Sequence, residues 1–228
     1  MVMNEVKKMF ESISLLAPKQ VAEIVGENEK LDHEKNMIVE QSNYSANIPR
    51  RFAKTRIGDF SVPFWDEVKD LSLTKSSSAL LVVSGPSGTG KTTFLTALMH
   101  ERAINGVGAG EYLVSHIVVP MIRSSRSFAA KESEFDIIQK YAKLPLVVFD
   151  ELGASEDPKL EASFFRTVFA LRYDNMLDTF VGTNLDVAGF KEFVAMGNNI
   201  TKDPIIDRMN DVIRFKKLVS ESHRGAKA

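Results

Sequence analysis

The sequence predicts an α/β fold in which a parallel sheet is covered by helices on both faces. Short apolar runs alternate with helical stretches from residue 79 onward, and a glycine-rich octet follows the first run directly. We expect strands at 79–84, 112–118, 144–149 and 179–183, with a last apolar run near 212–219. Helices are expected at 91–104, up to about 142, and at 159–177.

The octet at residues 85–92 reads G-P-S-G-T-G-K-T, a complete phosphate-binding loop placed between a strand and a helix. Glycines allow the backbone to turn several N–H groups toward phosphate oxygens, and the positive end of the next helix points to the same place. We expect Lys91 to meet the β- and γ-phosphates and the Thr92 hydroxyl to hold Mg²⁺. The predicted nucleotide-binding residues of the loop are Gly85, Pro86, Ser87, Gly88, Thr89, Gly90, Lys91, Thr92 and Thr93.

Two adjacent carboxylates, Asp150 and Glu151, end the apolar run 146–149. A buried strand in a P-loop protein ends beside the phosphates, so Asp150 is expected near Mg²⁺. Glu151 could orient the attacking water and accept its proton. Asn184, after the strand 180–183, could place its amide near the γ-phosphate, although Thr-Asn after a strand is also a common turn.

Composition narrows the class of protein. The 228 residues suit one substantial domain with a small appendage, and they include no cysteine, so disulfides and thiol chemistry are excluded and a cytoplasmic location is expected. No apolar stretch approaches the roughly 20 residues that cross a bilayer, so no membrane role is expected. The net charge of −1 means that any DNA contact must be a local patch.

The first 45 residues differ from the remainder. They carry eight acidic and five basic side chains, and apolar residues recur at helical spacing both before and after Pro18. The polar stretch 40–47 is interpreted as a linker. We therefore predict a helical segment and linker at 1–45, which either packs on the main domain or docks a partner, and an ATPase domain at 46–228.

Taken together, these motifs resemble the AAA+ ATPases, and more narrowly the DnaC/IstB branch of replicative-helicase loaders and transposition helpers. The resemblance covers about residues 48–224 and adds Asp207-Arg208-Met209, in which Arg208 corresponds to a finger that reaches the nucleotide of a neighbouring subunit. It also matches Arg224 to the sensor 2 arginine, and the lead-in 48–60, with Phe60, to the segment against the adenine. For both arginines a surface salt bridge is the alternative.

The resemblance implies a P-loop AAA+ sheet with a short N-terminal helical segment and no sizeable C-terminal lid. It also implies ATP/ADP and Mg²⁺ as cofactors, hydrolysis by Lys91, Glu151, Asn184, Arg208 and Arg224, and a homo-oligomer through the ATP site. The implied partners are single-stranded DNA and, through the N-terminal segment, a replicative helicase in the cytoplasm of a bacterial or phage-infected cell.

A small basic and aromatic patch lies in residues 119–128, where loaders line the path of single-stranded DNA. Arg123 and Arg126 would share a helix face, and Phe128 could stack on a base. The alternative is a solvated helix face with a phenylalanine in the core. For the whole chain, an IstB-like helper of a transposase remains an alternative function, and a small-molecule kinase or a non-catalytic ATP-binding adaptor is a more distant one.

Overall fold

The computed structural model describes residues 18–219, apart from residues 60, 61, 76, 109, 197 and 199. The strands are β1 Leu80–Ser84, β2 Glu111–Val114, β3 Leu146–Leu152, β4 Asp178–Thr183 and β5 Ile213–Lys217. The α-helices are α2 Pro18–Ala46, α3 Trp65–Val68, α4 Lys91–Ile104, α5 Val118–Ser125, α6 Glu134–Lys143, α7 Pro158–Asp174, α8 Val187–Ala195 and α9 Pro204–Val212. The 3₁₀ turns are η1 Arg50–Phe52, η2 Ile57–Asp59, η3 Lys69–Ser72, η4 Ser115–Ile117 and η5 Ile200–Lys202.

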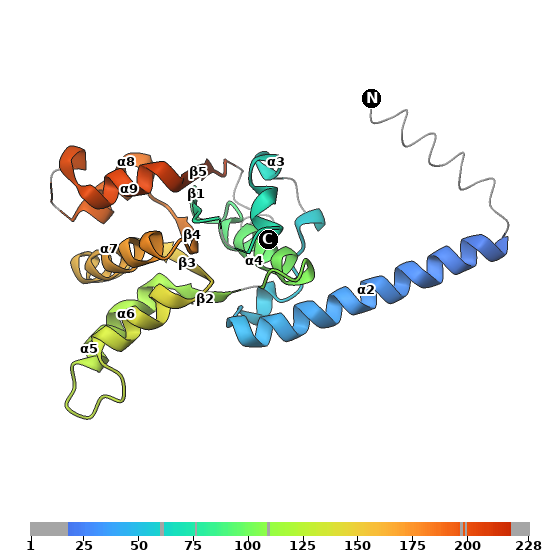
Figure 1. Ribbon diagram of the computed structural model, residues 1–228, viewed down its shortest axis with the longest axis horizontal. Helices are drawn as coiled ribbons and strands as arrows, with labels where there is room; N and C mark the ends of the chain where they lie inside the picture. Colours follow the sequence, from blue (N-terminus) through green and yellow to red (C-terminus); the bar gives the residue numbers. More distant parts are fainter. Residues whose placement is uncertain are drawn as a thin grey trace, which may run out of the picture.

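The five strands form one parallel sheet in the order β2-β3-β4-β1-β5, which confirms the predicted fold class. Alternation along β1 separates two cores. Leu80 and Val82 belong to the cluster under α5 to α9, whereas Leu81 and Val83 belong to the cluster under α3 and α4. Figure 1 shows these two groups of helices on either side of the sheet. The helices therefore cover both faces, as the strand-helix alternation predicts. Full burial of one such side chain contributes roughly 1.5–3 kcal/mol to stability.

Several helices begin at residues that satisfy their first N–H groups. Asp157 and Asp203 cap α7 and α9, and in each case the next residue is a proline, which suits the first helical position. Ser133 and Asp136 form a reciprocal capping box at the start of α6. These caps fix where α6, α7 and α9 begin.

Three sequence expectations need correction. The polar stretch 40–47 is no linker, because α2 runs on to Ala46 and buries Val39, Ser42 and Ala46 against the domain. The second expected strand ends at Val114 and is followed by η4 and α5. The helix that begins at Pro18 is not short but has 29 residues. Its first part projects from the sheet domain (Figure 1). The helix expected before Pro18 lies outside the described residues.

No helix within the described residues is both long and apolar enough to cross a bilayer. The described chain ends two residues after β5, and no helix follows β5 within it.

Candidate functional site

The phosphate loop connects the buried strand β1 to α4 at the carboxyl edge of the sheet. Gly88 and Gly90 have φ angles of 87° and 93°, in the left-handed region that other residues adopt only with strain. Gly90 is also the residue from which α4 starts. The glycines of the motif thus stand where the backbone needs them, and the first N–H groups of a 14-residue helix end at the loop.

Lys91 is the cation of the loop and is only 8% exposed. Its Nζ donates to the carbonyl oxygens of Gly85 and Pro86, at 2.7 and 2.9 Å, and to Asn184 Oδ1 at 2.7 Å. Phosphate oxygens are acceptors of the same kind and carry negative charge, so they can replace these partners. The structure therefore brings Lys91 and Asn184 together, in agreement with the expectation that each lies near the γ-phosphate.

Asp150 and Thr92 meet at the same edge. Thr92 Oγ1 donates to Asp150 Oδ2 at 2.6 Å, and the Tyr112 hydroxyl donates to the same oxygen at 2.7 Å. Burial raises the pKa of Tyr112, and the neighbouring charge of Asp150 raises it further, so the phenol keeps the proton that it donates. Gly182 makes room for this carboxylate, because a Cβ there would lie 2.1 Å from Asp150 Oδ1.

The donor set fits Mg²⁺. A hydroxyl and a carboxylate are hard oxygen ligands, and a magnesium ion in a nucleotide site takes one or two such ligands from the protein and the others from phosphates and water. Among the described residues no group of three or more His, Asp or Glu side chains could hold a metal alone. Thr92 and Asp150 would therefore hold the ion together with a bound triphosphate.

Glu151 adopts a backbone conformation that its residue type disfavours. Its φ is 59°, which costs about 1–2 kcal/mol for a residue with a Cβ, and it lies where the register between β3 and β4 shifts. The side chain is exposed, and His116 Nδ1 lies 3.4 Å from its Oε2. An exposed carboxylate on this strained backbone, next to Asp150, is a candidate for proton transfer.

These groups line one pocket of about 360 Å³. Its lining comprises Arg51, Phe52, Ser87, Gly88, Gly90, Lys91, Thr92, Thr93, Asp150, Glu151, Ala154 and Asn184. Arg51, Phe52 and Ala154 were not among the predicted site residues. Arg51 and Phe52 belong to the lead-in segment, and the Arg51 guanidinium lies 4.8 Å from the centre of the Phe52 ring. Phe60 and Arg224, also predicted site residues, lie outside the described residues.

The remaining predicted residues lie away from this pocket. Arg208, on α9, is half-exposed and its Nη1 lies 3.5 Å from Asp174 Oδ1. Arg123 pairs with Glu156 and Asp157, at 2.5 and 3.2 Å, and Arg126 pairs with Glu134 at 2.9 Å. Phe128 is fully exposed. The alternative interpretation, which placed this phenylalanine in the core, is therefore wrong on that point.

The fold is similar to those of solved replication proteins. The crystal structure of DnaI superposes with a TM-score of 0.59 at 17% identity, over 75% of this chain and 94% of that one. The crystal structure of the DnaC helicase loader superposes with a TM-score of 0.56 at 10% identity, over 75% of this chain and 100% of that one. The replication initiator DnaA, bound to AMPPCP and single-stranded DNA, superposes with a TM-score of 0.53 at 15% identity, over 75% of this chain and 52% of that one. At these identities the likeness shows the fold alone. No curated protein sequence matches the chain.

The sheet order, the phosphate loop after β1 and the carboxylate pair on β3 define a P-loop ATPase of the AAA+ type. Within that class, the sequence profile described as IstB-like ATP binding protein matches residues 61–227. The chain belongs to this family.

Proposed function

We propose that this chain is an ATP-dependent loader of a ring-shaped replicative DNA helicase onto single-stranded DNA, in which ATP binding drives assembly and hydrolysis drives release. The observation that carries the enzymatic part is the convergence of Lys91, Asn184 and the Thr92–Asp150 pair on one pocket with Glu151 at its wall. The similarity in fold to DnaI and the DnaC helicase loader supports the loading role.

In this proposal each pocket residue has a separate task. Lys91 exchanges its carbonyl partners for β- and γ-phosphate oxygens, and Asn184 turns its amide toward the γ-phosphate or the attacking water. Glu151 orients that water and accepts its proton. Bound Mg²⁺ would neutralise charge that develops on the phosphates.

Hydrolysis is completed by Arg208 of a neighbouring subunit. Arg208 is half-exposed on α9 and does not line its own pocket, so a cis role has no support in the described residues. Its ion pair with Asp174, at 3.5 Å between half-exposed groups, is worth at most about 1 kcal/mol, which is a small obstacle to a new contact. A guanidinium on the γ-phosphate stabilises the charge of the transition state.

Two inactive variants test the shared site. Arg208→Ala keeps the pocket but lacks the finger, and Lys91→Ala lacks the pocket's cation but supplies the finger. We expect each alone to lose hydrolysis, by about 10³-fold or more for Arg208→Ala. An equimolar mixture should recover activity, and the wild-type rate per subunit should rise with protein concentration and respond to single-stranded DNA. A flat rate together with a fully active Arg208→Ala variant would exclude the trans mechanism.

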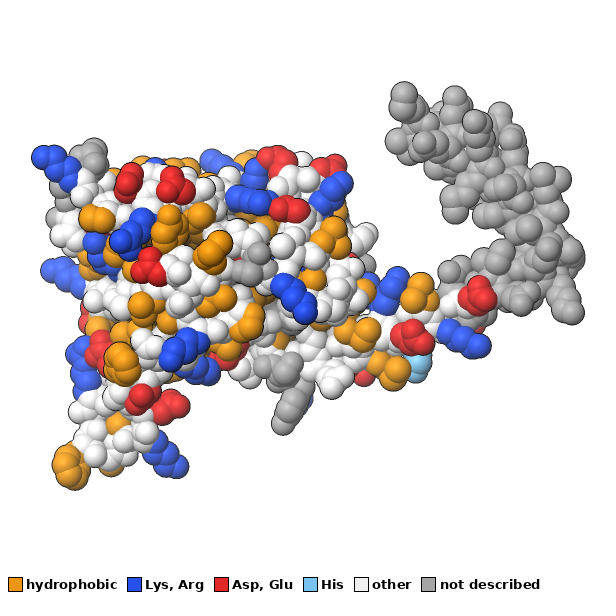
Figure 2. Space-filling model, in the orientation of Figure 1, with side chains coloured by type: hydrophobic (Ala, Val, Ile, Leu, Met, Phe, Trp, Pro, Cys, Tyr) orange, Lys and Arg blue, Asp and Glu red, His pale blue; other side chains and the backbone are white. Residues whose placement is uncertain are grey.

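Single-stranded DNA would bind at the tip formed by α5, α6 and the loop between them. Figure 2 shows hydrophobic side chains at this projecting tip, where Phe128 is fully exposed and can stack on a base. Arg123 and Arg126 would have to leave their carboxylates for DNA phosphates. Because exposed ion pairs contribute only about 0–1 kcal/mol, this exchange costs little. Phe128→Ala should weaken binding of a labelled oligonucleotide, while Leu73→Ala, which truncates another exposed apolar side chain away from the tip, should leave it unchanged.

The helicase would dock on the projecting part of α2. Leu31 and Ile38 are exposed and seven residues apart, so they lie on one face of the helix, whereas Val39, Ser42 and Ala46 face the domain. Deleting residues 1–36 keeps that packed part, and a deletion to residue 45 would not. We expect the shorter deletion and the pair Leu31→Glu with Ile38→Glu to lose helicase in a pull-down, with Lys30→Ala as the matched control.

The family match favours a second candidate, an IstB-like ATPase helper of a transposase. The two proposals differ in partner and in DNA. Recovery of a transposase rather than a helicase through the N-terminal segment, or a preference for duplex over single-stranded DNA, would favour the helper. Recovery of the helicase, with a single-strand preference, would favour the loader.

A further inference from the structure

Three hydrogen bonds hold the backbone of residues 151–153. Asp150 Oδ1 accepts from the N–H of Glu151 at 3.0 Å, and Thr183 Oγ1 donates to the carbonyl of Leu152 at 2.8 Å. Gly153, with φ 84°, donates its N–H to Glu161 Oε1 at 3.1 Å. Since Glu151 itself has a disfavoured φ, its position depends on such contacts.

Glu161 is the member of this set that no motif includes. It lies on α7, and its side chain is 0% exposed. Burial raises the pKa of Glu161, while the N–H groups of Gly153 and Ser155 and the charge of His116 lower it. An apolar side chain of similar size would avoid the cost of burying a carboxyl group. What the carboxyl group adds is its hold on the backbone of residues 153–155.

That backbone forms part of the pocket. Ala154 lines it next to Glu151, and the N–H of Ala154 donates to the carbonyl of Glu151 at 3.3 Å. A shift of Gly153 would therefore move both the wall of the pocket and the backbone that carries the Glu151 carboxylate.

We propose that Glu161 is a positioning residue for ATP hydrolysis, which acts through Gly153 to keep the Glu151 carboxylate in the pocket. This inference rests on the proposed role of Glu151. It assigns to α7 a function at the nucleotide site, although Glu161 does not line the pocket. The binding of ATP, in contrast, depends on the phosphate loop and not on Glu161.

The test compares Glu161→Leu with Glu161→Gln in the full chain. Leucine removes the acceptor, so we expect kcat to fall about 10-fold or more, as a small misplacement of a catalytic group does. The Kd for ATP, measured without turnover, should stay within about twofold because the loop of Lys91 is untouched. Glutamine keeps an amide oxygen that accepts from Gly153, and it should restore most of the rate.

A double-mutant cycle shows whether Glu161 acts through Glu151. In a Glu151→Gln background, Glu161→Leu should cost almost nothing further, because the group that it positions is already gone. A Glu161→Leu protein with the wild-type rate, an equal loss in Glu161→Gln, or a full further loss in the Glu151→Gln background would each overturn the inference. If Glu161→Leu does not fold, Glu161→Asp, which shortens the reach to Gly153, replaces it with the same expectations. An inactive wild type or a fully active Glu151→Gln would instead refute the proposed function.

Discussion

The two ends of α4 carry cations that meet β4 in opposite ways. At the start of the helix, Lys91 binds Asn184, the residue after β4, in the lining of a pocket. Near its end, Arg102 pairs with Asp178, the first residue of β4, at 3.4 Å in the interior. The same helix and strand thus have one end suited to exchanging ligands and one end suited to holding the fold.

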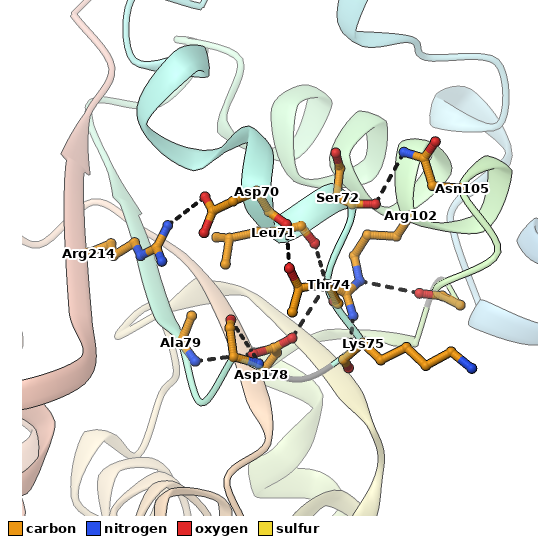
Figure 3. Close-up of polar contacts among 12 residues, drawn as sticks. Asp70, Leu71, Ser72, Thr74, Lys75, Ala79, Arg102, Asn105, Asp178 and Arg214 are labelled. Carbon is orange, nitrogen blue, oxygen red and sulfur yellow. Dashed lines mark hydrogen bonds and ion pairs between the residues drawn. The ribbon is translucent and has the colours of Figure 1, made fainter.

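The Arg102 end is closed to solvent. Arg102 and Asp178 are 1% and 0% exposed. Arg102 donates to the carbonyls of Leu71 and Thr74, and Asp178 Oδ1 accepts from the N–H of Ala79 at 3.1 Å (Figure 3). Burial lowers the pKa of Arg102, and the charge of Asp178 opposes that change. The pair ties the chain that leads into β1 to α4 and β4.

The Lys91 end differs because its acceptors can be replaced. They include two carbonyls of the phosphate loop and the amide oxygen of Asn184, a residue that is exposed. A charge that lines a pocket can exchange its partners for a ligand and so serve binding, whereas a charge pair closed to solvent serves stability.

The largest effect is expected from breaking the buried pair. Asp178→Ala leaves Arg102 buried without its counter-ion, so we expect the free energy of unfolding to fall by about 3–5 kcal/mol. Urea denaturation measures this change. Asp66→Ala, which breaks the exposed Lys69–Asp66 pair of 3.0 Å, is the control and should cost less than about 1 kcal/mol. Equal losses of unfolding free energy in the two variants would mean that the buried pair stabilises the fold no more than the exposed pair does.

The next effect is at the opposite end of α4. Lys91→Ala removes a charge-assisted donor from the site of the phosphates, and we expect hydrolysis to fall by about 10²–10³-fold. Its loss of unfolding free energy should be smaller than that of Asp178→Ala. The two measurements are steady-state phosphate release and urea denaturation of the same preparation. A variant that hydrolyses normally but unfolds easily would reverse our assignment of the two ends.

The smallest effect concerns His100, which lies between the two ends. Its ring nitrogens lie 2.7 Å from the Thr55 carbonyl and from Asn43 Oδ1 of α2. Burial lowers the pKa of His100 below its usual 6.5, and the hydrogen bond with the Thr55 carbonyl partly opposes this by stabilising the charged ring. The neutral ring therefore contributes stability above pH 6.5 that is lost as the pH falls through the folded pKa, by at most about 1.4 kcal/mol per pH unit.

Denaturation at about pH 7.5 and pH 5.5 checks this, with His100→Gln as the comparison. We expect a smaller loss of stability on acidification in the variant, because glutamine does not titrate. Identical losses in the two proteins would show that the junction of α2 with α4 does not sense pH.

The sequence predicted most of the nucleotide site and missed the residues that support it. The phosphate loop and Asp150-Glu151 are continuous strings, so local pattern was enough to find them. The sequence indicates a linker at Ser42 and Asn43 because polar residues that pack or hydrogen-bond inside a fold look like a loop in a sequence. Glu161, Arg102 and Asp178 are single charged residues in ordinary helix and strand contexts. Nothing nearby in the chain distinguishes them.

The sequence by itself determined the alternating strands and helices, the conformation of the loop at its glycines and the chemistry at the carboxyl ends of the strands. These depend on backbone preferences and side-chain periods within a few residues. Only the tertiary structure decided that Asn184 meets Lys91, that Gly182 makes room for Asp150 and that Glu161 holds Gly153. Those contacts join residues that are 8 to 93 positions apart, so packing alone brings them together.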